Sequence, residues 1–252
     1  MLFRSANITT LRAANNLAAG ARLGFDTTDG NRLYSQVFAN SAAGALGLVK
    51  LGNNMLTLRT GNTHTGGNWI YGGTLNISND TALGAAPGAA GVNLTFAGTG
   101  GTLRAAVGVT LVANRQVQID RGATATFESV SNLTLAVNGG ISGEGGLVKT
   151  GMGRLTLGAT NTYTGPTIVQ NGILRLTDSR FITQSSNMTL NGGVVELGTN
   201  TFQRAGGLGT ASNQIQVYGV SGFSIYDTGG DRTVQIGAGG SVVQWGSQYF
   251  DP

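Results

Sequence analysis

The chain has 252 residues, of which 43 are glycine, none is cysteine and only 10% are charged. Globular proteins usually have about 7% glycine and 25% charge, so this composition argues against an ordinary globular enzyme, and the lack of cysteine excludes disulfides and thiolate metal sites. The net charge of +4 reflects scarce acids, 11 in all, rather than clustered bases, which argues against nucleic-acid binding.

The N-terminal segment lacks the apolar stretch of about 7–15 residues that defines a secretory signal peptide. No run of the sequence approaches the roughly 18 apolar residues of a membrane-spanning helix, so we expect no direct membrane insertion. Residues 13–21 and 82–91 are the only stretches with a helix-like composition, and glycine disfavours a helix in the second. Because the chain begins within the strand pattern and stops without a capping pattern, we expect an internal fragment of a longer protein.

Short strands follow one another along the chain, with apolar residues at every second position. Clear examples are residues 56–58, 94–96, 117–119, 133–135 and 215–217. Pairs of glycine or asparagine, as at 53–54, 72–73 and 100–101, separate such strands. These residues tolerate positive φ and end strands sharply. The chain is therefore predicted to be all-β.

One segment occurs twice. Residues 48–77 read LVKLGNNMLTLRTGNTHTGGNWIYGGTLNI and residues 147–176 read LVKTGMGRLTLGATNTYTGPTIVQNGILRL, so equivalent positions are 99 residues apart. The copies share apolar and turn residues, including Lys50 with Lys149, and almost no reactive side chains. This pattern indicates a stacked array of β-coils.

The expected array is a solenoid with three strands of about five residues in each coil. Such a coil takes about 20–25 residues, so four to five coils would fill one 99-residue unit. With coils about 4.8 Å apart, the chain would form roughly 11 coils and a rod of about 50–60 Å. Inward Leu, Val, Ile and Phe would form a continuous core, and outward Thr, Asn, Gln and Arg would form solvated faces.

The second copy with its flanking glycines, residues 145–176, resembles the autotransporter-associated β-strand repeat of bacterial passenger domains. The shared elements are GLVKTG, LTL, NTYTG and GILRL. The first copy departs at 53–54, where two asparagines replace the glycine-bearing pair, and at His64, which replaces Tyr163. The resemblance implies a right-handed parallel β-helix (a three-sided solenoid) outside a Gram-negative-type cell. It also implies export through an outer-membrane barrel at the C-terminus of the full-length protein, beyond Pro252.

His64 is the only histidine of the chain. An acid–base or zinc role would require partners positioned around it. Since it lies in the NTHTG segment, where the other copy has Tyr163, we expect an exposed turn residue without a functional role.

Carboxylate pairs could still provide a glycosidase or lyase site, because glycoside hydrolysis needs two carboxyl groups roughly 5–10 Å apart. The candidate pairs are Asp26 with Asp29, Asp227 with Asp231, and, across coils, Asp120 with Glu144. The first two pairs lie in Gly/Thr turns, where aspartate commonly caps its own backbone. Neither pair has the spacing of a calcium loop. We therefore predict no catalytic and no metal-binding residue.

Four glycines superficially resemble a phosphate-cradling loop: Gly143, Gly145, Gly146 and Gly151. No helix pattern follows them, so they are better explained as turn residues. We predict no cofactor.

Aromatic side chains could form a sugar-stacking platform if they face outward, or could fill the core. They are Trp69, Tyr71, Tyr163, Trp245, Tyr249 and Phe250. Strand alternation places Trp69 and Tyr71 on one side and Ile70 on the other. Since Ile70 aligns with Val169, we expect Ile70 in the core and Trp69 and Tyr71 in solvent.

Together these patterns favour a non-enzymatic, surface-exposed β-helical passenger segment of an autotransporter-like protein. It would display or mediate adhesion and support folding coupled to secretion, with cell-surface glycans or other cells as partners. Residues 1–252 would form one segment, with spacer coils at 78–146 and 177–252. Two alternatives stay open: a β-helix carbohydrate-active lyase or hydrolase, which needs a clustered acidic groove, and a ligand-free structural spacer.

Overall fold

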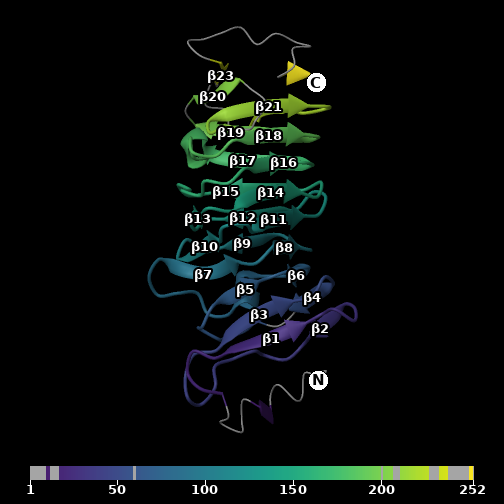
Figure 1. The fold of residues 1–252 in the computed structure, drawn as a ribbon, viewed down its shortest axis with the longest axis vertical. Coiled ribbons are helices and arrows are strands. Elements are labelled where there is room, and N and C mark those ends of the chain that lie inside the picture. The colour runs from purple at the N-terminus through teal and green to yellow at the C-terminus, as the bar shows by residue number, and fades with distance from the viewer. Residues whose placement is uncertain are drawn as a thin grey trace.

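The chain folds as a rod of stacked coils. The computed structural model describes residues 10–11, 17–58, 61–199, 201–206, 211–226, 233–237 and 250–251. The chain winds from one end of the rod to the other, so that each coil lies on the one before it (Figure 1). About eight coils are stacked. The predicted all-β, three-sided parallel β-helix is confirmed.

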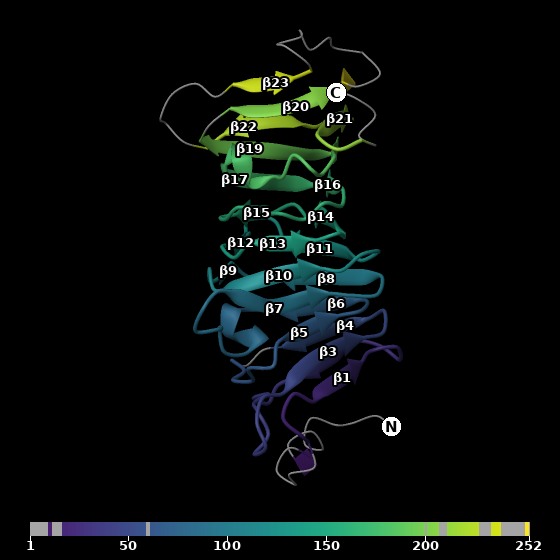
Figure 2. The same cartoon turned by 60° about the vertical axis from the view of Figure 1, so that its left-hand side comes forward.

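Three parallel sheets form the sides of the rod, and Figure 2 shows their strands stacked one above another. Sheet 1 contains β1 (Arg22–Asp26), β3 (Gly47–Leu51), β5 (Asn68–Ile70), β7 (Gly91–Phe96), β10 (Arg115–Ile119) and β13 (Ile141–Gly143). Sheet 3 contains β9 (Val109–Leu111), β12 (Thr134–Val137), β15 (Arg154–Leu157), β17 (Gly172–Asp178), β19 (Gly193–Thr199) and β22 (Gly222–Ile225).

Sheet 2 is the longest of the three and runs over nearly the whole rod. It contains β2 (Arg32–Tyr34), β4 (Met55–Leu58), β6 (Thr74–Ile77), β8 (Gly100–Ala105), β11 (Thr124–Ser129), β14 (Gly146–Thr150), β16 (Thr167–Val169), β18 (Met188–Asn191) and β21 (Gln214–Tyr218). At its C-terminal end lie β20 (Phe202–Gly206), β23 (Val234–Ile236) and β24 (Phe250–Asp251).

The length of one coil varies along the rod. Met55 pairs with Thr74, 19 residues further on, whereas Thr74 pairs with Thr102, 28 residues further on. The predicted coil of about 20–25 residues lies within this range. The expected total of roughly 11 coils is for all 252 residues, whereas the described residues form about eight.

Apart from residues 10–11, the described residues contain helix at two places only. Both are single turns of 3₁₀ helix, η1 (Asp80–Leu83) and η2 (Ser179–Phe181). Residues 82–83 end η1, residues 84–90 form an irregular corner and Gly91 begins β7, in keeping with the glycine content of this stretch. Residues 12–16 lie outside the described residues. No helix among the described residues has the length and apolarity needed to cross a membrane.

Strand alternation produces one continuous core along the rod. In β11, for example, Ala125 and Phe127 point inward and are fully buried, while Thr126 between them is part-exposed. The Phe127 ring packs edge-on against Phe96 of an adjacent coil, with centroids 5.5 Å apart. Burial of these apolar side chains contributes roughly 25 cal/mol per Å² to the folded state.

We expect Phe127→Ala to lower the free energy of unfolding by about 3–5 kcal/mol, because it leaves a cavity between two coils. Urea unfolding followed by circular dichroism measures this change. Thr126→Ala on the outward side is the control and should change stability by less than about 0.5 kcal/mol. Equal effects of the two substitutions would contradict the assigned register of β11.

Candidate functional site

Each copy of the repeat buries its lysine at a corner of the rod. In β14, alternation turns Leu147 and Lys149 inward. The Lys149 Nζ donates to the carbonyls of Thr150 (2.5 Å) and Gly151 (2.7 Å) in its own corner, and to Asn171 (3.2 Å) in the next coil. The ammonium thus replaces water around carbonyls that the corner would otherwise leave unpaired.

Lys50 makes the same arrangement in the first copy. Its Nζ donates to the carbonyls of Leu51 (2.8 Å), Gly52 (2.8 Å) and Gly72 (3.0 Å). Burial lowers the pKa of both Lys50 and Lys149 to about 8, although a carboxylate (Asp26 or Glu128) acts in the opposite sense. Since this value lies above 7, the ammonium form predominates at neutral pH.

Glycine is required beside each lysine because two coils approach closely there. Gly151 has φ 73° and Gly172 has φ 66°, in the left-handed region. A Cβ atom on Gly151 would lie 2.3 Å from the carbonyl oxygen of Ser129, and one on Gly172 would lie 2.5 Å from that of Gly151. The glycines that the two copies share are therefore imposed by backbone geometry.

A buried asparagine joins three successive coils. The Asn161 Oδ1 accepts from the backbone N–H of Ile141 in the preceding coil at 2.8 Å. Its Nδ2 donates to the carbonyl of Phe181 in the following coil at 2.7 Å. Asn62 makes the equivalent bonds in the first copy. Lysine and asparagine of each copy thus form a clasp that holds neighbouring coils in register.

The expectation that His64 is an exposed turn residue is wrong, because its side chain is fully buried. The NTHTG segment crosses the third side of its coil, and its residues are alternately exposed and buried, with Asn62 and His64 buried. The His64 Nε2 lies 3.0 Å from Asn68 Oδ1. In the second copy, the Tyr163 hydroxyl lies 2.6 Å from Thr167 Oγ1, again four residues on.

His64 belongs to a buried polar network without the geometry of an acid–base pair. Asn68 Nδ2 donates to the carbonyls of Leu83 and Asn93. The Arg115 guanidinium, itself fully buried, donates to Asn93 and to both carboxylate oxygens of Asp80, at 2.9 and 3.0 Å. Burial lowers the pKa of His64 and Arg115 acts in the same direction, which outweighs the opposing bonds to Asn68 and the backbone.

The candidate carboxylate pairs show capping and ion pairing. Asp26 is exposed and accepts from the backbone N–H and hydroxyl of Thr28, at 2.9 and 2.7 Å, which is the predicted capping of its own turn. Glu144 lies 3.8 Å from Arg121 Nε, and both side chains are exposed. Asp227 and Asp231 lie outside the described residues.

Arginine neutralises five of the carboxylates of the described residues. These pairs are Asp80–Arg115, Glu128–Arg104, Glu144–Arg121, Asp178–Arg180, and Glu196 with both Arg154 and Arg175. Burial alone would raise the pKa of Glu196, but the bonds from Arg175 and Arg154 lower it overall. A general acid needs the opposite shift. The described residues contain no group of three or more potential metal ligands.

Four of the remaining predicted residues lie where the strand pattern placed them: Gly143, Gly151, Ile70 and Tyr71. Gly143 and Gly151 have φ values of 110° and 73° at corners, in agreement with their interpretation as turn residues. Ile70 is buried and Tyr71 is 40% exposed, as predicted. Trp69 is only part-exposed, because the guanidinium of Arg22 stacks 3.7 Å from its ring centroid. Trp245 and Tyr249 lie outside the described residues, as does the side chain of Phe250.

The two copies of the repeat lie on different sides of the rod. β3, which begins the first copy, belongs to sheet 1, whereas β14 of the second copy belongs to sheet 2. From β3 the chain passes β5, β7, β10 and β13 in sheet 1, which is four full coils, before it reaches β14. The spacing of 99 residues between the copies therefore corresponds to four coils and one further side of the rod. Equivalent surfaces of the two copies thus face different directions.

Comparison with known proteins identifies the repeat. Residues 48–77 and 147–176 match the family model of the passenger-associated-transport-repeat. The chain is 37% identical over 157 residues to the "Adhesin BmaC autotransporter" of Brucella suis biovar 1 (strain 1330). This match covers 62% of the chain and only 4% of that relative. No solved structure matches the chain. The resemblance to autotransporter passenger repeats is confirmed.

We expect Lys149→Met to lower the free energy of unfolding by about 1–3 kcal/mol, because carbonyls at the corner lose their buried donor. Arg121→Met is the control, since it removes an exposed cation (side chain 89% exposed) from the preceding coil. Its effect should stay within about 0.5 kcal/mol. Urea unfolding measures both variants, and a Lys149→Met protein as stable as the control would contradict the clasp.

We expect the chain to lose stability as the pH falls from 6.5 to 5. Burial holds the folded-state pKa of His64 below the usual histidine value of about 6.5, so the unfolded state binds the proton first and acid favours unfolding. One such group contributes up to about 1.4 kcal/mol per pH unit. Unfolding measured at pH 7 and pH 5 should show this loss.

The double variant His64→Tyr with Asn68→Thr, which copies the pair found in the second repeat, provides the control. It should abolish the loss between pH 6.5 and 5, because tyrosine does not titrate there. An unchanged pH dependence in a folded double variant would show that His64 is not its source.

Proposed function

We propose that the chain is a non-enzymatic, surface-exposed segment of an autotransporter-type passenger that mediates adhesion. The observation that carries the proposal is the pair of passenger-associated-transport repeats, each built as a buried clasp within one β-helical rod. The similarity to a protein named an adhesin autotransporter supports it. Arginine pairing of the carboxylates supports a binding role over a hydrolytic one.

The rod suits adhesion because each coil contacts chiefly its neighbours. Such a solenoid is stiff and lengthens by duplication, so it holds a surface at a distance from its anchor. The third-of-a-turn offset between the repeats presents equivalent surfaces in different directions. The proposed partners are cell-surface glycans or other cells.

We further propose that residues 1–252 form one segment that lies outside the cell that makes them. An outer-membrane barrel of the same protein is the proposed route of export, in keeping with the similarity to an autotransporter. Local stacking of each coil on the previous one would let folding proceed as the chain emerges. The clasps would then hold each newly formed coil in register with its neighbours.

Display of the chain on a non-adherent bacterium tests the proposal. Cells that display it should adhere to a glycan-coated or cell-covered surface several-fold better than cells that display the empty scaffold. A variant lacking residues 23–47 removes one complete coil, since Leu23 pairs with Leu48, and controls for rod length. Adherence no higher than that of the empty scaffold for both proteins would instead indicate a ligand-free spacer.

A further inference from the structure

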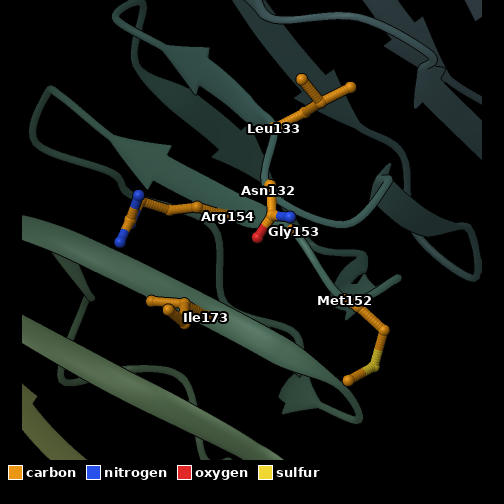
Figure 3. Close-up of a pocket in the computed structure, with 6 residues that line it drawn as sticks. All are labelled: Asn132, Leu133, Met152, Gly153, Arg154 and Ile173. Atoms are coloured by element: carbon orange, nitrogen blue, oxygen red, sulfur yellow. The ribbon is translucent and has the colours of Figure 1, made fainter.

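The corner of the second repeat contains an open groove. The groove has a volume of about 210 Å³ and is lined by Asn132, Leu133, Met152, Gly153, Arg154 and Ile173. Figure 3 shows the Asn132 amide beside Gly153, with Arg154 to one side and Met152 to the other. A hollow of this size fits about one sugar ring.

Gly153, one of the lining residues, stands where the first copy has Asn54. In the first copy, the Asn54 Nδ2 donates to the carbonyls of Thr27 (2.8 Å) and Thr28 (3.1 Å) and fills the corner. In the second copy, a Cβ atom on Gly153 would lie 2.1 Å from the Val130 carbonyl oxygen, so no side chain fits there. The two copies of the repeat thus differ in their own sequence at this corner.

One wall of the groove carries uncompensated positive charge. Arg154 donates through Nε (3.0 Å) and Nη2 (3.4 Å) to Glu196, and its Nη1 bonds to no acceptor among the described residues. Arg175 also bonds to Glu196, so two guanidinium groups share one carboxylate. The Arg175 guanidinium is further stacked on Tyr226, 4.0 Å from the ring centroid. This surface therefore attracts anions.

The other walls combine a polar amide with apolar surface. Asn132 has φ 62°, a conformation that few residues other than glycine adopt, and its exposed side-chain amide makes no hydrogen bond within the described residues. Met152 is 66% exposed beside part-buried Ile173. Guanidinium, amide and apolar surface match the carboxylate, hydroxyls and C–H face of an acidic sugar.

We propose that this groove binds a carboxylate-bearing sugar residue of an acidic glycan. The inference rests on the proposed adhesive function and names its ligand class. Arg154 Nη1 would donate to the sugar carboxylate, Asn132 would bond to ring hydroxyls, and Met152 with Ile173 would pack against the ring. Because Glu196 already holds the other donors of Arg154, the guanidinium is fixed before binding.

Isothermal titration with a galacturonic acid trisaccharide tests the proposal, with a galactose trisaccharide as the neutral comparison. We expect saturable binding of the acidic sugar, at least tenfold weaker binding of the neutral one, and weakening of the acidic binding by added salt. Asn132→Gly, which suits the positive φ, and Arg154→Gln should each raise the Kd at least tenfold. Arg121→Gln, an exposed arginine paired with Glu144 on another surface, should leave it unchanged.

Several results would overturn the assignment. They are the absence of saturable binding, equal binding of the neutral sugar, an unchanged Kd in both groove variants, and equally tight binding of a glutamate-rich peptide. Adherence of displaying cells separates this inference from the proposed function. If Asn132→Gly loses sugar binding while adherence persists, adhesion uses another surface of the rod. The groove is then not the site through which the cells adhere.

Discussion

The structure depends on how the buried polar groups of each corner are paired. A coil of about 20 residues that changes direction three times directs backbone carbonyls toward the interior, where an unpaired group costs roughly 1–3 kcal/mol. In both repeats a lysine ammonium donates to three such carbonyls, and an asparagine amide links the coils on either side. Once these bonds exist, glycine corners and short strands suffice to close the coil.

This constraint also explains why so little reactive chemistry is present. Side chains that could act as acids, bases or ligands are used to satisfy the fold: Lys149, Asn161, His64 and Arg115 are all buried and bonded. What remains available for recognition is the outward face of each sheet and the corners. There the second repeat differs from the first through the replacement of Asn54 by Gly153.

Much of the fold could be predicted from the sequence, because period-two alternation and glycine corners are local properties. The repeat was visible for the same reason, and its Lys and Asn positions were identical in both copies. Their roles were not visible, since the carbonyls that they bond belong to other coils. His64 is buried although NTHTG has a turn-like composition, because successive residues of this segment alternate between exposed and buried. The groove could not be predicted, because the residues that line it come from three successive coils.

Amide hydrogen exchange of the wild type and of Asn161→Ala tests the clasp most directly. If the asparagine holds three coils together, the variant should lose protection from the coil of Ile141 to that of Phe181, because both of its bonds are lost. Amides near Asn62 in the first repeat should keep their protection. Loss confined to the neighbours of residue 161, or spread evenly over the rod, would contradict the account.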